Sequence, residues 1–319
     1  MLLGNLFRRK RLEGLVGRIK SADGGQVKDW VALMQILREQ GRLDADTIMR
    51  IDSHEIDARG YAVNHYAREI EAAAQLELRE LAATVSAQAP QEVIARALDI
   101  IVQKKSIFQC RDSHTEGGYY ADAESGMDWQ WEHLIAPYIE DADLSCVLEL
   151  APGHGRNSAK LIAQGARQLH LVDVNQTCID ACRRRFGERA GDCAMHYHVT
   201  GGDSLPFIGD ESISFVYSFD SMVHFDKSIM LAYLREFARV MRPGATGYLH
   251  HSNYGAIAPN SDWAKNVGNR SDMTAELFRA FCDAVGLEVT AQKMHGMAEG
   301  RGQDDLDCAS LIRKPVMLR

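Results

Sequence analysis

Two periodicities alternate along residues 146–313, one typical of buried strands and one typical of helices. Five short apolar runs predict strands, at 146–150, 168–173, 196–199, 213–219 and 245–249. The stretches between them carry apolar residues three or four positions apart, as in Leu231, Leu234 and Phe237. Strands that alternate with helices favour an α/β fold with a parallel sheet. Two last runs, at 288–294 and 307–313, predict an antiparallel pair at the sheet edge.

The first part of the chain shows only the helical pattern. Between Val27 and Gln103, apolar residues such as Trp30, Met34 and Leu37 recur at helical spacing. Residues 68–89 are rich in Ala, Glu, Leu and Gln, which are good helix formers. We therefore expect a helical accessory region over residues 1–125, as a dimerisation or lid element, and a ligand-binding domain over residues 126–319.

The chain begins with a basic amphipathic pattern. Leu2, Leu3, Leu6 and Phe7 precede Arg8-Arg9-Lys10-Arg11, and further apolar residues follow up to Ile19. Such a helix can rest weakly on an anionic membrane surface, but the pattern fits packing against its own protein or a second subunit better. The stretch lacks the small-residue cleavage site of a secretory signal. No apolar run approaches the ~20 residues that a bilayer requires.

Composition narrows the class of protein. The chain has 319 residues, 46% of them hydrophobic and 25% charged, as in ordinary globular proteins. A net charge of -8 disfavours general nucleic-acid binding, although a local basic patch remains compatible with it. Seven cysteines without paired spacing indicate reduced thiols in a cytoplasmic protein. Cys178 and Cys182 lie one helical turn apart, but zinc needs two further ligands, so we interpret them as packing residues and expect no metal.

Candidate chemistry gathers where the first strand ends. The loop after it contains Gly153 and Gly155, which lack a Cβ and let the backbone turn tightly against a ligand. Asp173 ends the next strand, 20 residues after Gly153, where a carboxylate accepts hydrogen bonds from ribose hydroxyls. The dinucleotide pattern fails at Ser158, and Glu149 would repel a pyrophosphate but suits an ammonium group. These residues predict an adenosine ligand without phosphate.

The motif Glu149-x-Ala151-Pro152-Gly153-His154-Gly155 resembles the first motif of class I S-adenosylmethionine-dependent methyltransferases. The resemblance extends from about Tyr120 to Arg313, with Ala151 where the family commonly has glycine. A glycine-rich turn in an ordinary βα unit is the alternative for the loop alone, but it does not explain Asp173 and the later matches. The resemblance implies a Rossmann-like, seven-stranded, mostly parallel sheet with an antiparallel last strand, and S-adenosylmethionine as the cofactor.

The resemblance also implies which residues hold the cofactor. Asp203 and Ser204 follow the third strand, at the family position that holds the adenine edge, with a solvated turn as the alternative. Tyr120 and Trp131 resemble cofactor-covering residues, with core packing as the alternative. The expected cofactor contacts are Glu149, Ala151, Gly153, Gly155, Asp173, Val174, Asp203, Ser204, Phe219 and Trp131.

The acceptor end is expected after the strands at 213–219 and 245–249, because strand carboxyl ends face the ligand crevice. His224 is the base candidate, since an imidazole with a pKa of about 6.5 is largely neutral at neutral pH. Asp220 or Asp226 would orient its ring; helix capping or solvation of His224 is the equal alternative. Alternation sends His250 and His251 to opposite faces, and we assign His251 to the acceptor site, beside Asn253 and Tyr254.

These expectations predict a methyltransferase that moves a methyl group to a small-molecule or glycan hydroxyl by in-line displacement. The Asn/Asp-Pro-Pro-Tyr pattern of enzymes that methylate base or glutamine amino groups is absent, which disfavours nucleobase nitrogen as acceptor. Two alternatives remain, namely N-methylation of a small amine and a cofactor-binding scaffold without catalysis. The loop at 255–270, with Asn260, Trp263 and Asn269, is long enough to shape acceptor specificity. Further expected partners are a second copy of the chain, through the N-terminal helices, and the membrane surface.

Overall fold

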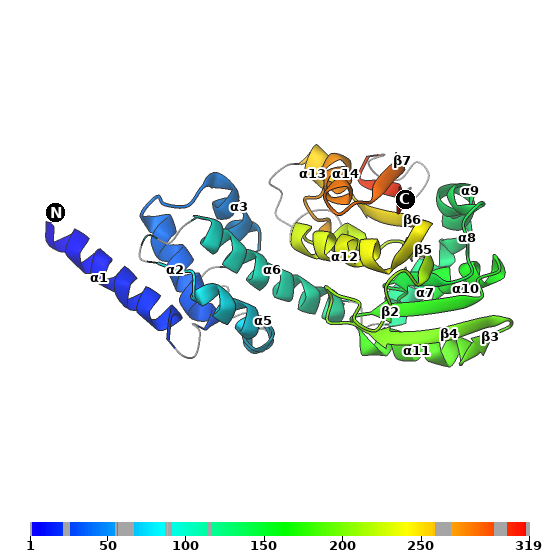
Figure 1. Ribbon diagram of the computed structural model, residues 1–319, viewed down its shortest axis with the longest axis horizontal. Coiled ribbons are helices and arrows are strands. Elements are labelled where there is room, and N and C mark those ends of the chain that lie inside the picture. The colour runs from blue at the N-terminus through cyan, green and yellow to red at the C-terminus, as the bar shows by residue number, and fades with distance from the viewer. Residues whose placement is uncertain are drawn as a thin grey trace. The chain divides into compact units, whose positions relative to one another are not determined.

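A computed structural model describes residues 2–21, 26–54, 56, 67–86, 88, 91–113, 117–258, 269–296 and 305–316. The described residues fall into two compact units, one ending at Phe108 and one beginning at Gln109 (Figure 1). Each unit has a hydrophobic core of its own. Asn260 and Trp263, which were expected to shape acceptor specificity, lie outside the described residues.

The first unit is helical in its described part. Its helices are α1 (Leu2–Ile19), α2 (Val27–Glu39), α3 (Ala45–Ser53), α5 (Ala67–Ala82) and α6 (Gln91–Ser113), the last of which continues into the second unit. The apolar stripes of the sequence form the core, with Trp30 and Ile94 fully buried. Asp44 caps α3, because its side chain accepts a hydrogen bond from the backbone N–H of Thr47.

Helix α1 packs its second half into the core of the first unit. Leu12, Leu15, Val16 and Ile19 are buried there, with Leu15 only 1% exposed. The apolar face expected for this helix is therefore used within the chain over residues 12–19. The side chains of residues 2–9, which carry the first part of the basic pattern, lie outside the description. None of the described helices is long and apolar enough to span a membrane.

The second unit is built on one sheet. Its strands are β1 (Val147–Leu150), β2 (Gln168–Asp173), β3 (Arg189–Ala190), β4 (Cys193–Val199), β5 (Ile213–Ser218), β6 (Met241–Ser252), β7 (Glu288–His295) and β8 (Asp307–Arg313). The spatial order is β3-β4-β2-β1-β5-β6-β8-β7. Strand β8 runs antiparallel to β6 and β7, and the pairs among β4, β2, β1, β5 and β6 are parallel. The expected mostly parallel sheet with an antiparallel last strand is confirmed.

Two details of the sheet differ from the sequence prediction. Strand β3 adds an edge strand that pairs antiparallel with β4, and its two residues are too few to show a periodicity. Strand β6 begins at Met241 instead of Ala245, because the Arg-Pro-Gly stretch belongs to the strand. The pairing with β5 shifts register between Ile213 and Phe215, which accommodates this irregular start.

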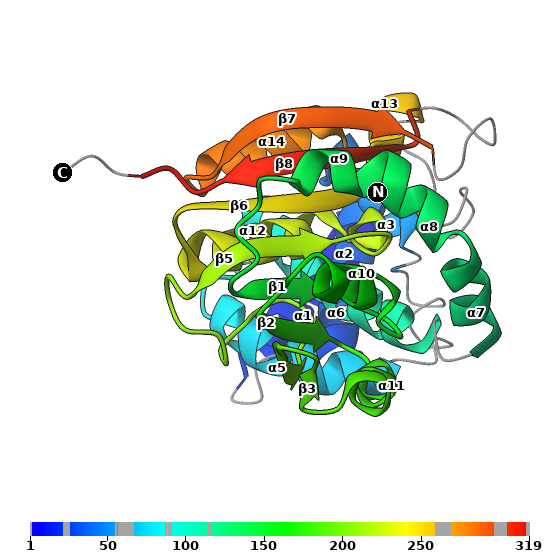
Figure 2. The same ribbon diagram turned by 90° about the vertical axis from the view of Figure 1, so that its right-hand side faces the viewer.

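Helices cover both faces of the sheet. They are α7 (Gly117–Ser125), α8 (Met127–Gln130), the π-helical turn η1 (Trp131–Ile135), α9 (Ala136–Ile139), α10 (Arg156–Ala163), α11 (Gln176–Phe186), the 3₁₀ turn η2 (Met222–His224), α12 (Lys227–Val240), α13 (Tyr254–Ile257) and α14 (Ala275–Ala284). In Figure 2, α10 lies in front of the sheet and α12 and α14 lie behind it. Right-handed crossovers that leave the sheet centre in opposite directions require this placement. The strand order reverses between β1 and β5, where open α/β sheets bind ligands.

Candidate functional site

The loop between β1 and α10 has an unusual backbone. Ala151, Gly153 and Gly155 have φ values of 58°, 56° and 83°, all in the left-handed region. Glycine adopts this region freely, whereas an alanine there costs about 1–2 kcal/mol. Ala151 therefore occupies a position whose backbone favours glycine, which explains why a glycine is common there in the family that the motif resembles.

The two glycines allow aromatic rings to approach the loop. A Cβ on Gly153 would lie 2.6 Å from Cε1 of Tyr120, and one on Gly155 would lie 2.5 Å from Cε2 of Phe186. The sequence argument expected the bare backbone to face a ligand. In the structure, the space that each missing Cβ leaves is filled by a ring of the protein itself, so both glycines are required by packing.

Tyr120 and two cysteines hold the loop from the side of α11. The ring of Tyr120 stacks on His154 at 3.7 Å between centroids, and its hydroxyl lies 3.0 Å from Cys178 Sγ. Cys182 Sγ donates to the carbonyl of Gly153 at 3.2 Å. Burial raises the pKa of Cys178 to about 12, so its thiol stays protonated. Both cysteines therefore act as packing residues.

Two buried carboxyl groups lie at the ends of neighbouring strands. Glu149 on β1 is 1% exposed, and Ser158 Oγ donates to its Oε2 at 2.6 Å. Asp173 ends β2, is 6% exposed, and accepts from the N–H of Asn175 at 2.9 Å. Burial raises the pKa of Glu149 to about 7 and that of Asp173 to about 6. Carboxylates that are this poorly solvated favour a ligand that brings hydroxyl donors and a positive charge.

The turn after β4 lies beside Asp173. Thr200 donates its backbone N–H to the carbonyl of Asp173 at 2.9 Å and its hydroxyl to the carbonyl of Ser204 at 2.7 Å. Asp203 and Ser204 are half-buried in this turn, and Val174 is half-buried directly after β2. The structure therefore brings these expected contacts to the same edge as Asp173. Three polar parts of S-adenosylmethionine, namely its ribose, its adenine edge and its ammonium group, match this set of acceptors.

Two expected cofactor contacts are core residues in the structure. Trp131 is 5% exposed and packs in the hydrophobic core of the second unit with Met127 and Ile135. Phe219 is 4% exposed in the same core, and its ring stacks on His250 at 4.7 Å. The placement of Trp131 thus fits core packing, which was the alternative to a role in covering the cofactor.

Asp220 pairs with a residue to which the sequence assigned no role. Arg156, the first residue of α10, donates from Nη2 to Asp220 Oδ2 at 2.6 Å. Its Nη1 donates to the carbonyl of Ala123 at 2.8 Å and to Gln130 Oε1 at 3.1 Å. Arg156 therefore joins the glycine loop, the helices before β1 and the end of β5. The sequence contained a signal for this pair, because Arg156 directly follows Gly155 and an acid follows the end of β5.

His224 lies half-exposed in η2, after the end of β5. Its Nδ1 is 3.0 Å from the carbonyl oxygen of Asn269. A carbonyl only accepts, so Nδ1 carries the proton and Nε2 is the basic nitrogen of the neutral ring. The two acids expected to orient this ring have other partners, because Asp220 pairs with Arg156 and Asp226 caps α12 through Ser228.

The structure places His250, and not His251, toward the end of β5. His251 is fully buried, with Nε2 2.8 Å from Ser310 Oγ and its ring stacked on Phe278 of α14 at 3.9 Å. Burial lowers its pKa to about 3. His250 points to the opposite face, where its Nδ1 accepts the N–H of Asp220 at 3.0 Å. The two histidines lie on opposite faces of β6, as expected from alternation. Helix α14 covers His251, which was the histidine assigned to the acceptor site, and His250 is the one that contacts the turn after β5.

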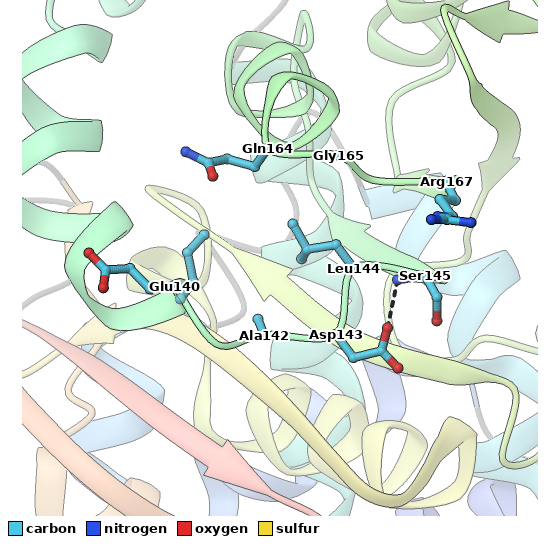
Figure 3. A pocket seen from close by; sticks show the side chains of 9 residues that line it. Glu140, Ala142, Asp143, Leu144, Ser145, Gln164, Gly165 and Arg167 are labelled. Carbon is cyan, nitrogen blue, oxygen red and sulfur yellow. Dashed lines mark hydrogen bonds between the residues drawn. The ribbon is translucent and has the colours of Figure 1, made fainter.

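A separate hollow of about 390 Å³ lies at the other end of β1 (Figure 3). Its walls come from residues 139–145, which precede β1, and from residues 164–167, which precede β2. The N–H of Ser145 donates to Asp143 Oδ1 at 2.9 Å across its rim. It contains none of the expected site residues and faces away from the glycine loop.

The strand order, the glycine loop after β1 and the two buried acids define a Rossmann-like domain for an adenosine-bearing ligand. Residues 147–244, just under a third of the chain, match the protein family described as "Methyltransferase domain". The second unit thus contains a methyltransferase domain of the class I, Rossmann-like kind. The cofactor of this class is S-adenosylmethionine, which the acceptors at the ends of β1, β2 and β4 fit.

Individual proteins resemble parts of the chain. Ribosomal RNA small subunit methyltransferase A of Synechococcus sp. (strain CC9605) is 31% identical over 78 residues, which are 23% of this chain and 28% of that enzyme. An S-adenosylmethionine-dependent methyltransferase from Mesorhizobium loti covers 59% of this chain and 100% of its own, with a TM-score of 0.49 and 14% identity. The putative methyltransferase bound to the Haloferax volcanii Trm112 activator covers 65% and 99%, with a TM-score of 0.47 and 17% identity.

Proposed function

We propose that this chain is an S-adenosylmethionine-dependent methyltransferase that acts on a hydroxyl of a small molecule or glycan, with His224 as the general base. The observation that carries the proposal is the contact between His224 Nδ1 and the carbonyl of Asn269. It makes Nε2 the proton-accepting atom of a half-exposed imidazole beyond the carboxyl end of β5, where ligands of open α/β sheets bind.

Each residue of the site has a role in this proposal. S-adenosylmethionine, when bound, supplies a methyl group that is already activated on a sulfonium. Asp173 accepts the ribose hydroxyls, Glu149 faces the ammonium group, and Asp203 with Ser204 holds the adenine edge. With the cofactor bound, His224 Nε2 would take the acceptor's hydroxyl proton as the O–C bond forms and the bond from the methyl carbon to sulfur breaks, which leaves a neutral thioether. Alignment contributes about 7–11 kcal/mol and a positioned base roughly 10²- to 10⁴-fold.

Other acceptors are alternatives to the hydroxyl. An amine acceptor needs no strong base, and a scaffold needs no acceptor at all. The Synechococcus enzyme's name suggests RNA, but a net charge of -8 opposes general RNA binding. A cytoplasmic location belongs to the same proposal, because the six cysteines whose side chains are described are free thiols.

The test is a transfer assay with methyl-labelled S-adenosylmethionine and a panel of hydroxyl, amine and RNA acceptors, read by mass. His224→Gln should lower kcat for hydroxyl acceptors about 10²-fold or more, and leave the Kd for the cofactor within twofold. His133→Gln is the matched control, because His133 is exposed and its Nδ1 contacts a carbonyl, that of Trp129, at 2.9 Å. This variant should behave as wild type.

The outcomes separate the alternatives. Labelled product from amines alone, with His224→Gln fully active, would replace O-methylation by N-methylation. Cofactor binding without any product would indicate a scaffold. An RNA product would move the acceptor to the class named for the relative. No calorimetric heat with S-adenosylmethionine would reject the cofactor site itself.

A further inference from the structure

A buried ionic cluster lies behind the acceptor end of the sheet. It consists of His250 on β6, Asp307 on β8 and Arg270 before α14, which are 0%, 0% and 7% exposed. Arg270 donates from Nε and Nη2 to the two carboxylate oxygens of Asp307, at 3.0 and 2.8 Å. Burying such a pair costs desolvation that apolar residues would avoid, so its presence calls for a role beyond packing.

One end of the cluster holds the turn after β5. His250 Nδ1 accepts the N–H of Asp220, so the ring carries its proton on Nε2. Nε2 lies 3.5 Å from Asp307 Oδ2, and no closer hydrogen-bond partner exists among the described residues. Asp220 has a φ of 61°, a strained conformation for a residue with a side chain. His250 therefore stabilises a strained turn whose carboxylate binds Arg156.

The other end of the cluster holds η2, which carries His224. Arg270 lies between Asn269 and Ser271, whose backbone groups bind this turn. The carbonyl of Asn269 contacts His224 Nδ1 at 3.0 Å, and the N–H of Ser271 donates to the carbonyl of Val223 at 2.9 Å. The two hydrogen bonds from the guanidinium of Arg270 to Asp307 therefore tie the segment that contacts η2 to strand β8.

We propose that Asp307 is a positioning residue for the acceptor site. Through Arg270 it places the carbonyl that sets the tautomer of His224, and through His250 it holds the Asp220 turn. The inference rests on the proposed function only in taking His224 as the base. Whether Asp307 places His224 can be measured in the folded protein without an acceptor.

The Arg270–Asp307 pair stays charged at working pH. Burial alone would raise the pKa of Asp307, but the hydrogen bonds of His250 and Arg270 and the positive charge of Arg270 hold it below its usual value. His295 covers the cluster, with its ring stacked on His250 at 4.8 Å. Burial lowers the pKa of His295 to about 4, so it adds no charge near neutral pH.

The experiment compares Arg270→Lys and Asp307→Asn with wild type. Lysine keeps the charge but loses the second bond, and asparagine keeps the shape but loses the charge. We expect the ¹⁵N resonances of the His224 ring to move from the Nδ1-protonated pattern toward an average of both tautomers. We expect kcat to fall at least tenfold, with the KM for S-adenosylmethionine within twofold. Arg313→Lys is the control, since Arg313 pairs with Glu288 on the same hairpin but is half-exposed.

The two readouts keep the inference separate from the proposed function. If no acceptor is ever methylated, the proposed function fails, and the His224 resonances alone still decide whether Asp307 positions the ring. Unchanged His224 resonances in both variants would overturn the inference, whatever happens to kcat. A loss of kcat with a parallel loss of folded protein in both variants, and wild-type His224 resonances in the folded fraction, would overturn it as well.

Discussion

At the scale of single residues, the two buried carboxyls decide how the site responds to pH. Glu149 and Asp173 have pKa values raised by burial to about 7 and about 6. Because the folded state raises these two pKa values, it binds the carboxyl protons more tightly than the unfolded chain does. The free energy of unfolding of the ligand-free protein is therefore highest at a pH below the pKa values of the unfolded chain, and it falls as the pH rises to about 7. A cationic ligand with hydroxyl donors needs the ionised forms, so ligand binding has the opposite pH dependence.

We therefore predict that the affinity for S-adenosylmethionine rises as the pH is raised from 5 to 8, by about tenfold or more per carboxyl titrated. Calorimetric titration at a series of pH values measures this. Glu149→Gln should bind more weakly at pH 8 and lose the part of the dependence centred near pH 7. Glu276→Gln, on the exposed side of α14, serves as the control. An affinity that is flat across this range would show that neither carboxyl faces the ligand.

The sequence predicted where both acids lie, because each stands near the end of a strand. It did not predict their pKa values. Periodicity identifies Glu149 as part of a buried strand, but the size of its pKa shift depends on Ser158 and on the depth of burial. In the same way, the sequence named His224 and Asp220 without their partners, Asn269 and Arg156. Those partners lie far along the chain, so no local pattern connects them.

At the scale of elements, the glycine loop contains an alanine, Ala151, in a left-handed backbone conformation that favours glycine. Ala151→Gly should relieve the left-handed conformation and stabilise the protein by about 0.5–1 kcal/mol, after the greater freedom of glycine in the unfolded chain is subtracted. Ala159→Gly is the matched control, because the same exchange inside α10 should destabilise by about 1 kcal/mol. Denaturant unfolding measures both. Opposite signs are expected, and a loss of stability in both variants would contradict the argument.

Element order was predictable from the chain, and some element ends were not. Helix α11 begins after Asn175, whose side chain accepts from the N–H of Thr177, a cap that is visible in the sequence. Strand β6 starts earlier than its apolar run, because Met241 pairs with Ile213 of β5 and this extends the strand through residues that have no strand pattern. Pairing partners supply backbone hydrogen bonds that the local sequence does not encode.

At the scale of the whole molecule, two units with separate cores should unfold in separate transitions. Leu15→Ala should destabilise only the helical unit, by about 2–5 kcal/mol, because it leaves a cavity in that unit's core. Leu76→Ala, at a 67% exposed position on α5, should change stability by less than about 0.5 kcal/mol. Calorimetry with and without S-adenosylmethionine distinguishes the transitions, since the cofactor should raise only the other one. A single transition shifted by Leu15→Ala would contradict separate unfolding.

The partners expected for the helical unit remain predictions. The buried face of α1 from Leu12 to Ile19 packs within its own unit, so a homodimer or a membrane contact would have to use other surfaces. Light scattering of the full chain tests the dimer, and sedimentation with anionic vesicles tests the membrane contact.

The sequence by itself determined the order of strands and helices, the two acids near the carboxyl ends of β1 and β2, and the class of domain. Periodicity records which side of each element is buried, and the glycine loop is a local feature of the chain. Only the tertiary structure decided that Arg156 binds Asp220, that His250 and not His251 reaches the turn after β5, and that Asn269 sets the tautomer of His224. These contacts join residues distant in the chain, and a buried polar atom is satisfied by whichever partner the packing of the elements brings to it.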